Sequence, residues 1–222
     1  RARVAFDQAM RQNKKSGEER TSGKVLMVTS SNPNEGKTTL ALAIARSAAM
    51  AGQSVLLVDC DLRKPSVHRH LGVEPATGLQ ELLQSEDPDY VQSLPKILMK
   101  DPVSNASVIV GSRRSSIPTD QLLANATFQR LLSAARRSFD LIVLDTPPVG
   151  PVVDPLYICQ QSDAIAFVVK WASTAQSDVK KNVAALEEAS AGHVPVLIAL
   201  TQQERSRSEY YKKYSGYYSY SS

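Results

Sequence analysis

A short stretch ending in Gly36-Lys37-Thr38 constrains the fold of this chain more than any other feature. It lies between an apolar run at residues 25–28 and a helical pattern of apolar residues at 40–45. A phosphate-binding loop needs this order of strand, loop and helix, because backbone N–H groups at the start of the helix must face the anion. The segment predicts a nucleotide-binding α/β domain, although the usual pattern has a glycine where this chain has Ser31.

Two further apolar runs end in aspartate, VLLVD at 55–59 and LIVLD at 141–145. Parallel strands deliver their last side chains to one edge of the sheet, where nucleotides bind. Asp59 and Asp61 flank Cys60, so an extended chain would point both carboxylates to the same side. Asp145 is expected to hold Mg²⁺ through water at the end of its strand.

The order of predicted elements favours a phosphate-loop fold with one mostly parallel sheet and helices on both faces. Strands are predicted at 24–29, 54–59, 107–110, 141–145, 164–170 and 195–200, and helices at 3–13, 37–51, 78–84, 119–137, 153–161 and 175–190. The stretch 85–105 is interrupted by prolines and is predicted to be irregular. We divide the chain into a domain at 1–201, with an N-terminal helix and linker at 1–23, and a flexible tail at 202–222.

Composition excludes several classes of function. No apolar stretch approaches the roughly 20 residues of a membrane-spanning helix, so the segment itself is expected to be soluble. The net charge of +4, with scattered Lys and Arg, does not indicate a nucleic-acid partner. Cys60 and Cys159 have neither metal spacing nor a disulfide pattern, which favours a reduced cytosolic setting. The chain begins at Arg1 without a secretory signal, which fits a piece of a longer protein.

Each part of the predicted ATP and Mg²⁺ site has a chemical reason. Backbone amides of the loop wrap the β-phosphate, Lys37 bridges the β and γ oxygens, and the Thr38 hydroxyl binds Mg²⁺. The expected nucleotide contacts in the loop are Asn34, Glu35, Gly36, Lys37, Thr38 and Thr39. The expected metal ligands are Thr38, Asp59 and Asp145, and the expected catalytic residues are Lys37, Asp59 and Asp61. One of the paired aspartates would accept a hydroxyl proton, and the sequence leaves open which one. Arg63 is more typical of a surface or packing group than of a phosphate ligand.

The end of the chain is dominated by tyrosine. The candidate phosphoacceptors are Tyr210, Tyr211, Tyr214, Tyr217, Tyr218 and Tyr220. Lys, Ser and Gly between them leave no continuous apolar face, which favours a flexible tail. Each phosphate would add about −1.5 to −2 charges. We expect these charges to repel the tail from an acidic, metal-lined site of a neighbouring subunit, so that the unphosphorylated protein associates and the phosphorylated one is mainly monomeric.

Together these segments resemble the bacterial tyrosine kinases of capsule and exopolysaccharide export. The resemblance covers roughly residues 24–220 and rests on the tyrosine cluster and four motifs, EGKTT at 35–39, VLLVDCDLRKPSVHRHLGV at 55–73, TGLQELL at 77–83 and DTPPVGPVVD at 145–154. It implies an ATP-dependent tyrosine autokinase that phosphorylates its own tail and regulates polysaccharide polymerisation and export. It also implies a transmembrane chain-length regulator as activating partner, fused upstream or separate, and a cognate tyrosine phosphatase. It further implies self-association, for which a ring is one arrangement. It also implies a location at the cytoplasmic face of the bacterial inner membrane.

The chain departs from the family pattern in three places. An E-x-x-R-x-x-R pattern common near the N-terminus of relatives reads Ala5, Gln8 and Arg11 here, which weakens the expectation of a ring. Thr201 stands where relatives carry an asparagine that meets the adenine, so we expect Thr201 to contact the nucleotide. Asn34 stands where glycine is common, and asparagine tolerates the left-handed conformation.

Two other functions remain open at this point. One is a nucleotide-binding but catalytically weak adaptor of the export machine. The other is an ATPase of the partitioning and cell-division type, which shares the fold and the aspartate positions. Those ATPases carry a second lysine five residues before the loop lysine, where this chain has Asn32. Phosphotyrosine formed on incubation with ATP and Mg²⁺ would separate the kinase from both.

Overall fold

The computed structural model describes residues 22–85, 94–112 and 117–203. The helix predicted at 3–13 and the six acceptor tyrosines lie outside them. No helix in the described ranges combines the length and the apolar character needed to cross a membrane.

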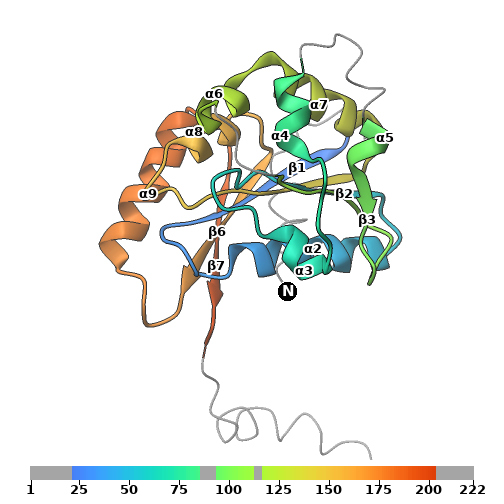
Figure 1. The fold of residues 1–222 in the computed structure, drawn as a ribbon. Coiled ribbons are helices and arrows are strands. Elements are labelled where there is room, and N and C mark those ends of the chain that lie inside the picture. The colour runs from blue at the N-terminus through green and yellow to red at the C-terminus, as the bar shows by residue number, and fades with distance from the viewer. Residues whose placement is uncertain (1–21, 86–93, 113–116, 204–222) are drawn as a thin grey trace, which may run out of the picture.

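A seven-stranded sheet forms the centre of the domain (Figure 1). Its strands are β1 (Lys24–Ser30), β2 (Val55–Asp59), β3 (Leu98–Lys100), β4 (Ser107–Ile109), β5 (Leu141–Asp145), β6 (Ala164–Lys170) and β7 (Val196–Thr201). The strand order is β3-β4-β2-β5-β1-β6-β7. All neighbouring strands are parallel except β3 and β4. The predicted α/β fold with a mostly parallel sheet is confirmed.

The three strands of the predicted site are neighbours. β5 pairs with β1 on one side and with β2 on the other, and its last residue, Asp145, lies opposite Val28 and Asp59. β2 and β5 are buried along their whole length, because helices cover both faces of the sheet. Such strands appear in the sequence as continuous apolar runs. Parallel register therefore brings Asp59 and Asp145 side by side at one edge.

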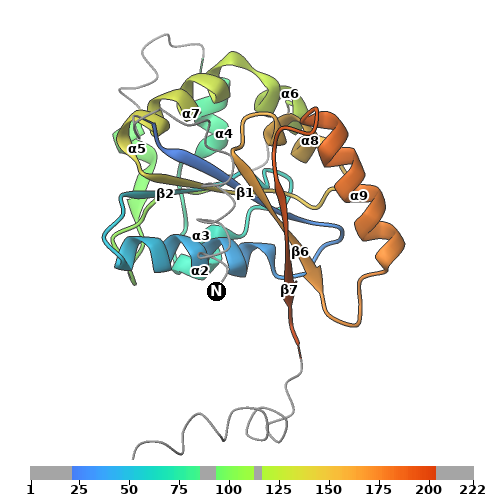
Figure 2. The ribbon, with the colours of Figure 1, turned by 180° about the vertical axis from the view of Figure 1, so that it is seen from behind.

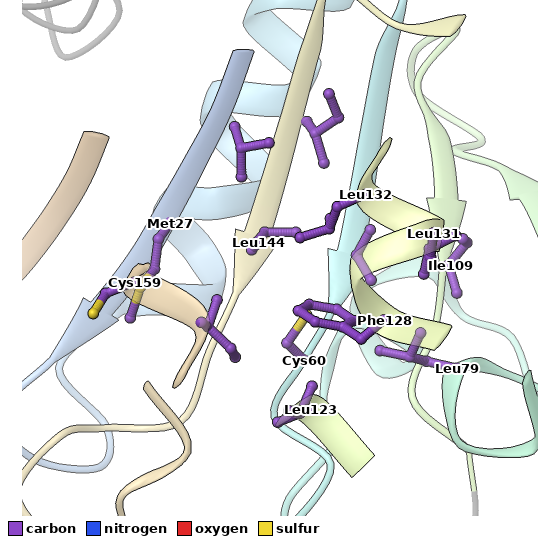
Figure 3. Close-up of a cluster of buried hydrophobic side chains, with 14 of the residues drawn as sticks. Met27, Cys60, Leu79, Ile109, Leu123, Phe128, Leu131, Leu132, Leu144 and Cys159 are labelled. Atoms are coloured by element: carbon purple, nitrogen blue, oxygen red, sulfur yellow. The ribbon is translucent and has the colours of Figure 1, made fainter. Parts of the chain in front are cut away.

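Helices cover the two faces unequally (Figures 1 and 2). They are α2 (Lys37–Met50), α3 (Val67–Leu71), α4 (Leu79–Gln84), α5 (Leu94–Ile97), α6 (Thr119–Ala124), α7 (Ala126–Ser138), α8 (Asp154–Cys159) and α9 (Gln176–Ala189). The alanine-rich α2 packs with α3 on one face. The remaining helices pack on the other, where Phe128 of α7 lies among Cys60, Leu79 and Leu123 (Figure 3).

The structure corrects three local predictions. The single helix expected at 119–137 is two helices, because Asn125 adopts an extended conformation and its side chain accepts a hydrogen bond from the Phe128 N–H at the start of α7. The region 94–100 is not irregular but forms α5 and β3. α3 was not predicted at all, since five residues are too few to show a helical period.

Candidate active site

The loop between β1 and α2 has the backbone geometry of an anion-binding turn. Asn34 and Gly36 both have left-handed conformations, with φ of 64° and 93°. The predicted tolerance of Asn34 for this conformation is confirmed. Gly36 immediately precedes the 14-residue α2, whose first N–H groups have no partner within the helix. Turns of this kind followed by a helix N-terminus bind phosphate groups.

The side chain of Glu35 turns away from the cavity and anchors the loop. It is 3% exposed. Its Oε2 accepts a hydrogen bond from the Asn32 N–H at 3.0 Å, and its Oε1 accepts one from the Thr174 hydroxyl. Only the backbone of Glu35 is therefore placed to meet a nucleotide.

The end of β7 lies against the same loop. The Thr201 hydroxyl donates to the Glu35 carbonyl at 2.7 Å, and the Gln202 amide donates to the Asn34 carbonyl at 3.2 Å. The bond to the Glu35 carbonyl uses the Thr201 hydroxyl to hold the loop. An adenine contact by Thr201 stays a prediction.

Lys37 and Asp61 form an ion pair at the cavity. The distance between Lys37 Nζ and Asp61 Oδ2 is 3.1 Å, and the two side chains are 12% and 5% exposed. The other carboxylate oxygen of Asp61 accepts a hydrogen bond from the Lys64 N–H at 3.1 Å. The first and second predicted motifs therefore meet directly.

Asp59 lies behind Asp61 and holds the chain that follows β2. Its Oδ1 accepts a hydrogen bond from the Asp61 N–H at 3.2 Å, and its Oδ2 accepts two, from Ser66 and Val67, at 3.0 Å. Burial raises the pKa of Asp59 to about 6, against the opposing effect of these N–H groups. The structure thus gives the paired aspartates different surroundings.

Asp145 is buried at the end of β5, and neither of its carboxylate oxygens has a hydrogen-bond partner in the described part of the chain. Burial raises its pKa to about 8, and the negative charge of Asp59 adds to this effect. Buried polar atoms without partners are costly, so these oxygens indicate a place for a cation or for water. The described residues contain no cluster of three acidic, histidine or cysteine ligands. Thr38 and Asp145 nevertheless fit Mg²⁺ bound mainly by phosphate and water oxygens.

A cavity of about 640 Å³ opens over the loop. Of the predicted site residues, its lining includes Asn34, Gly36, Lys37, Thr38, Thr39 and Asp61, while Glu35, Asp59, Asp145 and Thr201 lie behind or beside it. Lys64, Ser66 and Arg69 also line the cavity and were not predicted, because their place there depends on the path of the chain into α3.

The charge of the cavity wall differs from expectation. Lys37, Arg63, Lys64 and Arg69 line it, and Asp61 is the carboxylate among its lining residues. We expected an acidic site that repels a phosphorylated tail, but this wall is mainly basic and suits phosphate groups. Repulsion by the wall is therefore not a reason for subunits to separate.

Arg63 pairs with another side chain of the fold, in agreement with the surface or packing role predicted for it. Its guanidinium donates two-pronged hydrogen bonds to Asp154, at 3.0 to 3.3 Å. Asp154, at the start of α8, is 1% exposed and also accepts a hydrogen bond from Thr119. The pair ties the segment after β2 to α6 and α8.

The raised pKa of Asp145 predicts how stability depends on pH without metal. The folded pKa of about 8 lies above the ordinary 3.8, so the folded protein binds a proton at Asp145 more tightly than the unfolded chain does. The stabilisation that this protonation gives is complete below pH 3.8 and is lost as the pH rises through about 8. Asp59, with its pKa of about 6, acts in the same direction, whereas the positive charge of Lys37 opposes it. In EDTA, we expect the free energy of unfolding in urea to fall by more than about 1 kcal/mol from pH 5 to pH 8.5.

Two variants test the source of this pH dependence. Asp145→Asn should flatten the dependence, and Asp178→Asn, a change on the exposed surface of α9, should leave it unchanged. A free energy of unfolding that rises with pH in the wild type would contradict the assignment.

Comparisons with known proteins agree with this geometry. Residues 23–190 match a family model described as an AAA domain. The chain is 37% identical over 162 residues to the tyrosine-protein kinase CpsD of Streptococcus pneumoniae serotype 4, covering 71% of this chain and 67% of CpsD. It is 32% identical over 153 residues to the succinoglycan biosynthesis transport protein ExoP of Rhizobium meliloti, covering 68% of this chain and 19% of ExoP. The solved kinase domain of the Escherichia coli tyrosine kinase ETK aligns with a TM-score of 0.78 and 26% identity, covering 93% of this chain and 74% of that one.

Proposed function

The chain belongs to the bacterial tyrosine kinases of capsule and exopolysaccharide biosynthesis, and from this premise we propose how its residues transfer a phosphoryl group from ATP to tyrosine. It is a protein tyrosine kinase domain with the autokinase function of that family. The observation that carries the assignment of roles is the pairing of Lys37 Nζ with Asp61 Oδ2 at 3.1 Å. A cation for the phosphates and a carboxylate for the acceptor proton are adjacent in one cavity.

The loop and Lys37 bind the nucleotide. N–H groups from Asn34 to Thr39 receive the β-phosphate, and Lys37 reaches the γ-phosphate from the first turn of α2. Thr38 and Asp145 would hold Mg²⁺, with water between the ion and Asp145. The ion would neutralise negative charge on the phosphate oxygens. Thr201 steadies the loop through the Glu35 carbonyl, and we propose that it also contacts the nucleotide.

Asp61 is the base in this proposal. Its carboxylate lines the cavity, whereas the oxygens of Asp59 already accept three backbone hydrogen bonds and are buried. Because a tyrosine hydroxyl has a pKa near 10, Asp61 accepts the proton late in the transfer rather than before it. Asp59 fixes the backbone on which Asp61 stands and contributes to the metal site through its remaining lone pair.

The acceptors are the tail tyrosines of a neighbouring subunit. Gln202 contacts Asn34, so the chain leaves β7 beside its own phosphate loop. Tyr210 follows only eight residues later, which requires a sharp reversal for transfer within one chain. Transfer between subunits needs no such reversal, and it requires the self-association that we propose for this chain.

A mixing experiment tests both the activity and its direction. A full-length Lys37→Met chain is combined with a chain ending at Gln202, ATP and Mg²⁺, and phosphotyrosine is measured on each. We expect label on the full-length inactive chain, rising with the concentration of the truncated one. The wild type should label itself in parallel. Absence of label on the mixed inactive chain at every concentration would argue for transfer within one chain, and no label on the wild type would leave an adaptor.

The wider role follows the relatives. The chain spans about two thirds of CpsD and about a fifth of ExoP, so the matching region occurs both in short and in much longer proteins. We place this kinase at the cytoplasmic face of the inner membrane, activated by a transmembrane chain-length regulator, fused or separate. A cognate phosphatase reverses the tail phosphorylation, and cycling between the two states regulates polysaccharide export.

A further inference from the structure

The hydroxyl of Ser66 faces the hydroxyl of Thr38. Their Oγ and Oγ1 atoms are 3.1 Å apart, and either atom can be the donor. Thr38 is 8% exposed in the first turn of α2, and Ser66 lies immediately before α3 and lines the same cavity. Two segments separated by 28 positions therefore meet through their hydroxyl groups at the place assigned to the metal.

The backbone around Ser66 is fixed in this position. The N–H groups of Ser66 and Val67 both donate to Asp59 Oδ2 at 3.0 Å. On the other side, Pro65 packs so closely against Gly111 that a Cβ on this glycine would lie 2.6 Å from the proline ring. The backbone at Ser66 is consequently held in place, and its hydroxyl lies 3.1 Å from the Thr38 hydroxyl.

A hydroxyl that binds a cation uses an oxygen lone pair and must direct its proton to another acceptor. Second-shell acceptors of this kind orient the ligand and increase its basicity. Ser66 Oγ has the lone pairs to accept the Thr38 proton, which leaves the lone pairs of Thr38 free for the metal. The buried Asp145 carboxylate is the competing acceptor, because, although the larger effect of burial raises the pKa of Asp145, the Thr38 hydroxyl acts on it and lowers this pKa.

We infer that Ser66 is a positioning residue for the divalent cation, which accepts the proton of the Thr38 hydroxyl and turns its lone pairs toward the metal. The inference rests on the proposed Mg²⁺–nucleotide site and assigns it a residue outside the phosphate loop and the two aspartate motifs. Ser66 thereby links the segment after β2 to the proposed metal site.

The test measures nucleotide binding rather than kinase activity. Full-length wild type, Ser66→Ala and Ser66→Thr are titrated with fluorescently labelled ADP in EDTA and then at increasing Mg²⁺. For Ser66→Ala, we expect the Mg²⁺ concentration that gives half of the affinity gain to rise about 10-fold to 100-fold. Affinity in EDTA should stay within about twofold of the wild type. Ser66→Thr, which keeps the hydroxyl, should restore the wild-type Mg²⁺ dependence.

The control is Ser133→Ala on the exposed surface of α7, which should behave as the wild type. An unchanged Mg²⁺ dependence in Ser66→Ala would overturn the inference and assign the Thr38 proton to Asp145. An equal loss of affinity in EDTA and in Mg²⁺ would also overturn it, because Ser66 would then only support the loop. If the wild type itself gained no affinity from Mg²⁺, the proposed metal site would fail together with the inference.

Discussion

Lys37→Met is expected to lower the rate of tail phosphorylation at least ~10²-fold, because it removes a positive charge aimed at the charge that develops on the transferred group. Methionine keeps the length and most of the apolar volume of lysine. The change also leaves Asp61, the proposed base, without its partner at 3.1 Å. Phosphotyrosine formed per minute by purified protein in ATP and Mg²⁺ measures the effect.

The matched control for this prediction is Lys181→Met, on the exposed surface of α9. It should keep the wild-type rate, and both variants should unfold at urea concentrations close to that of the wild type. Autophosphorylation of Lys37→Met at the wild-type rate would remove Lys37 from the catalytic residues. A loss of rate in both lysine variants would point to a general effect of charge.

Asp61→Asn is expected to lower the rate by about 10² to 10⁴-fold, the usual contribution of a general base. Asparagine has nearly the same shape and retains an oxygen that can accept the Lys64 N–H. The amide cannot take the phenolic proton, so the loss should appear in kcat rather than in the KM for ATP. Steady-state phosphorylation at varied ATP measures both quantities.

Asp59→Asn separates the two aspartates. Three N–H groups donate to the Asp59 carboxylate. The NH₂ group of asparagine would face at least one of them, so two buried donors would point at each other without an acceptor. We expect the free energy of unfolding to fall by about 1 to 3 kcal/mol, whereas Asp61→Asn should change it by less than about 1 kcal/mol. If Asp59→Asn kept its stability and lost the larger part of kcat, the two roles would have to be exchanged.

Parts of the site could be predicted because they depend on neighbours in sequence. The left-handed turn at Asn34 and Gly36, the helix that follows, and the aspartates at the ends of β2 and β5 all follow from local residue patterns. Parallel pairing then places the strand ends at one edge. The basic wall could not be predicted, because Lys64 and Arg69 reach the cavity only through the path of the chain around α3.

Asp59 and Asp61 have different hydrogen-bond partners, which their positions in the sequence did not predict. Alternation along the chain places both carboxylates on one side, but Asp59 accepts hydrogen bonds from three N–H groups of the following segment, whereas Asp61 forms an ion pair with Lys37.

The short β3 depends on pairing with β4, and the segment after it is tied to α2 by the ion pair of Arg46 and Asp101, which also lie far apart in sequence.

The sequence by itself determined the fold class, the phosphate loop, the aspartate-ended strands and the family, because these reside in continuous segments whose apolar period and turn residues act locally. The tertiary structure decided which carboxylate faces the cavity, the pairing of Ser66 with Thr38, and the basic charge of the wall. Those features depend on contacts between segments that are tens of residues apart. Such contacts are selected by burial and hydrogen-bond satisfaction in the packed domain, and no local pattern encodes them.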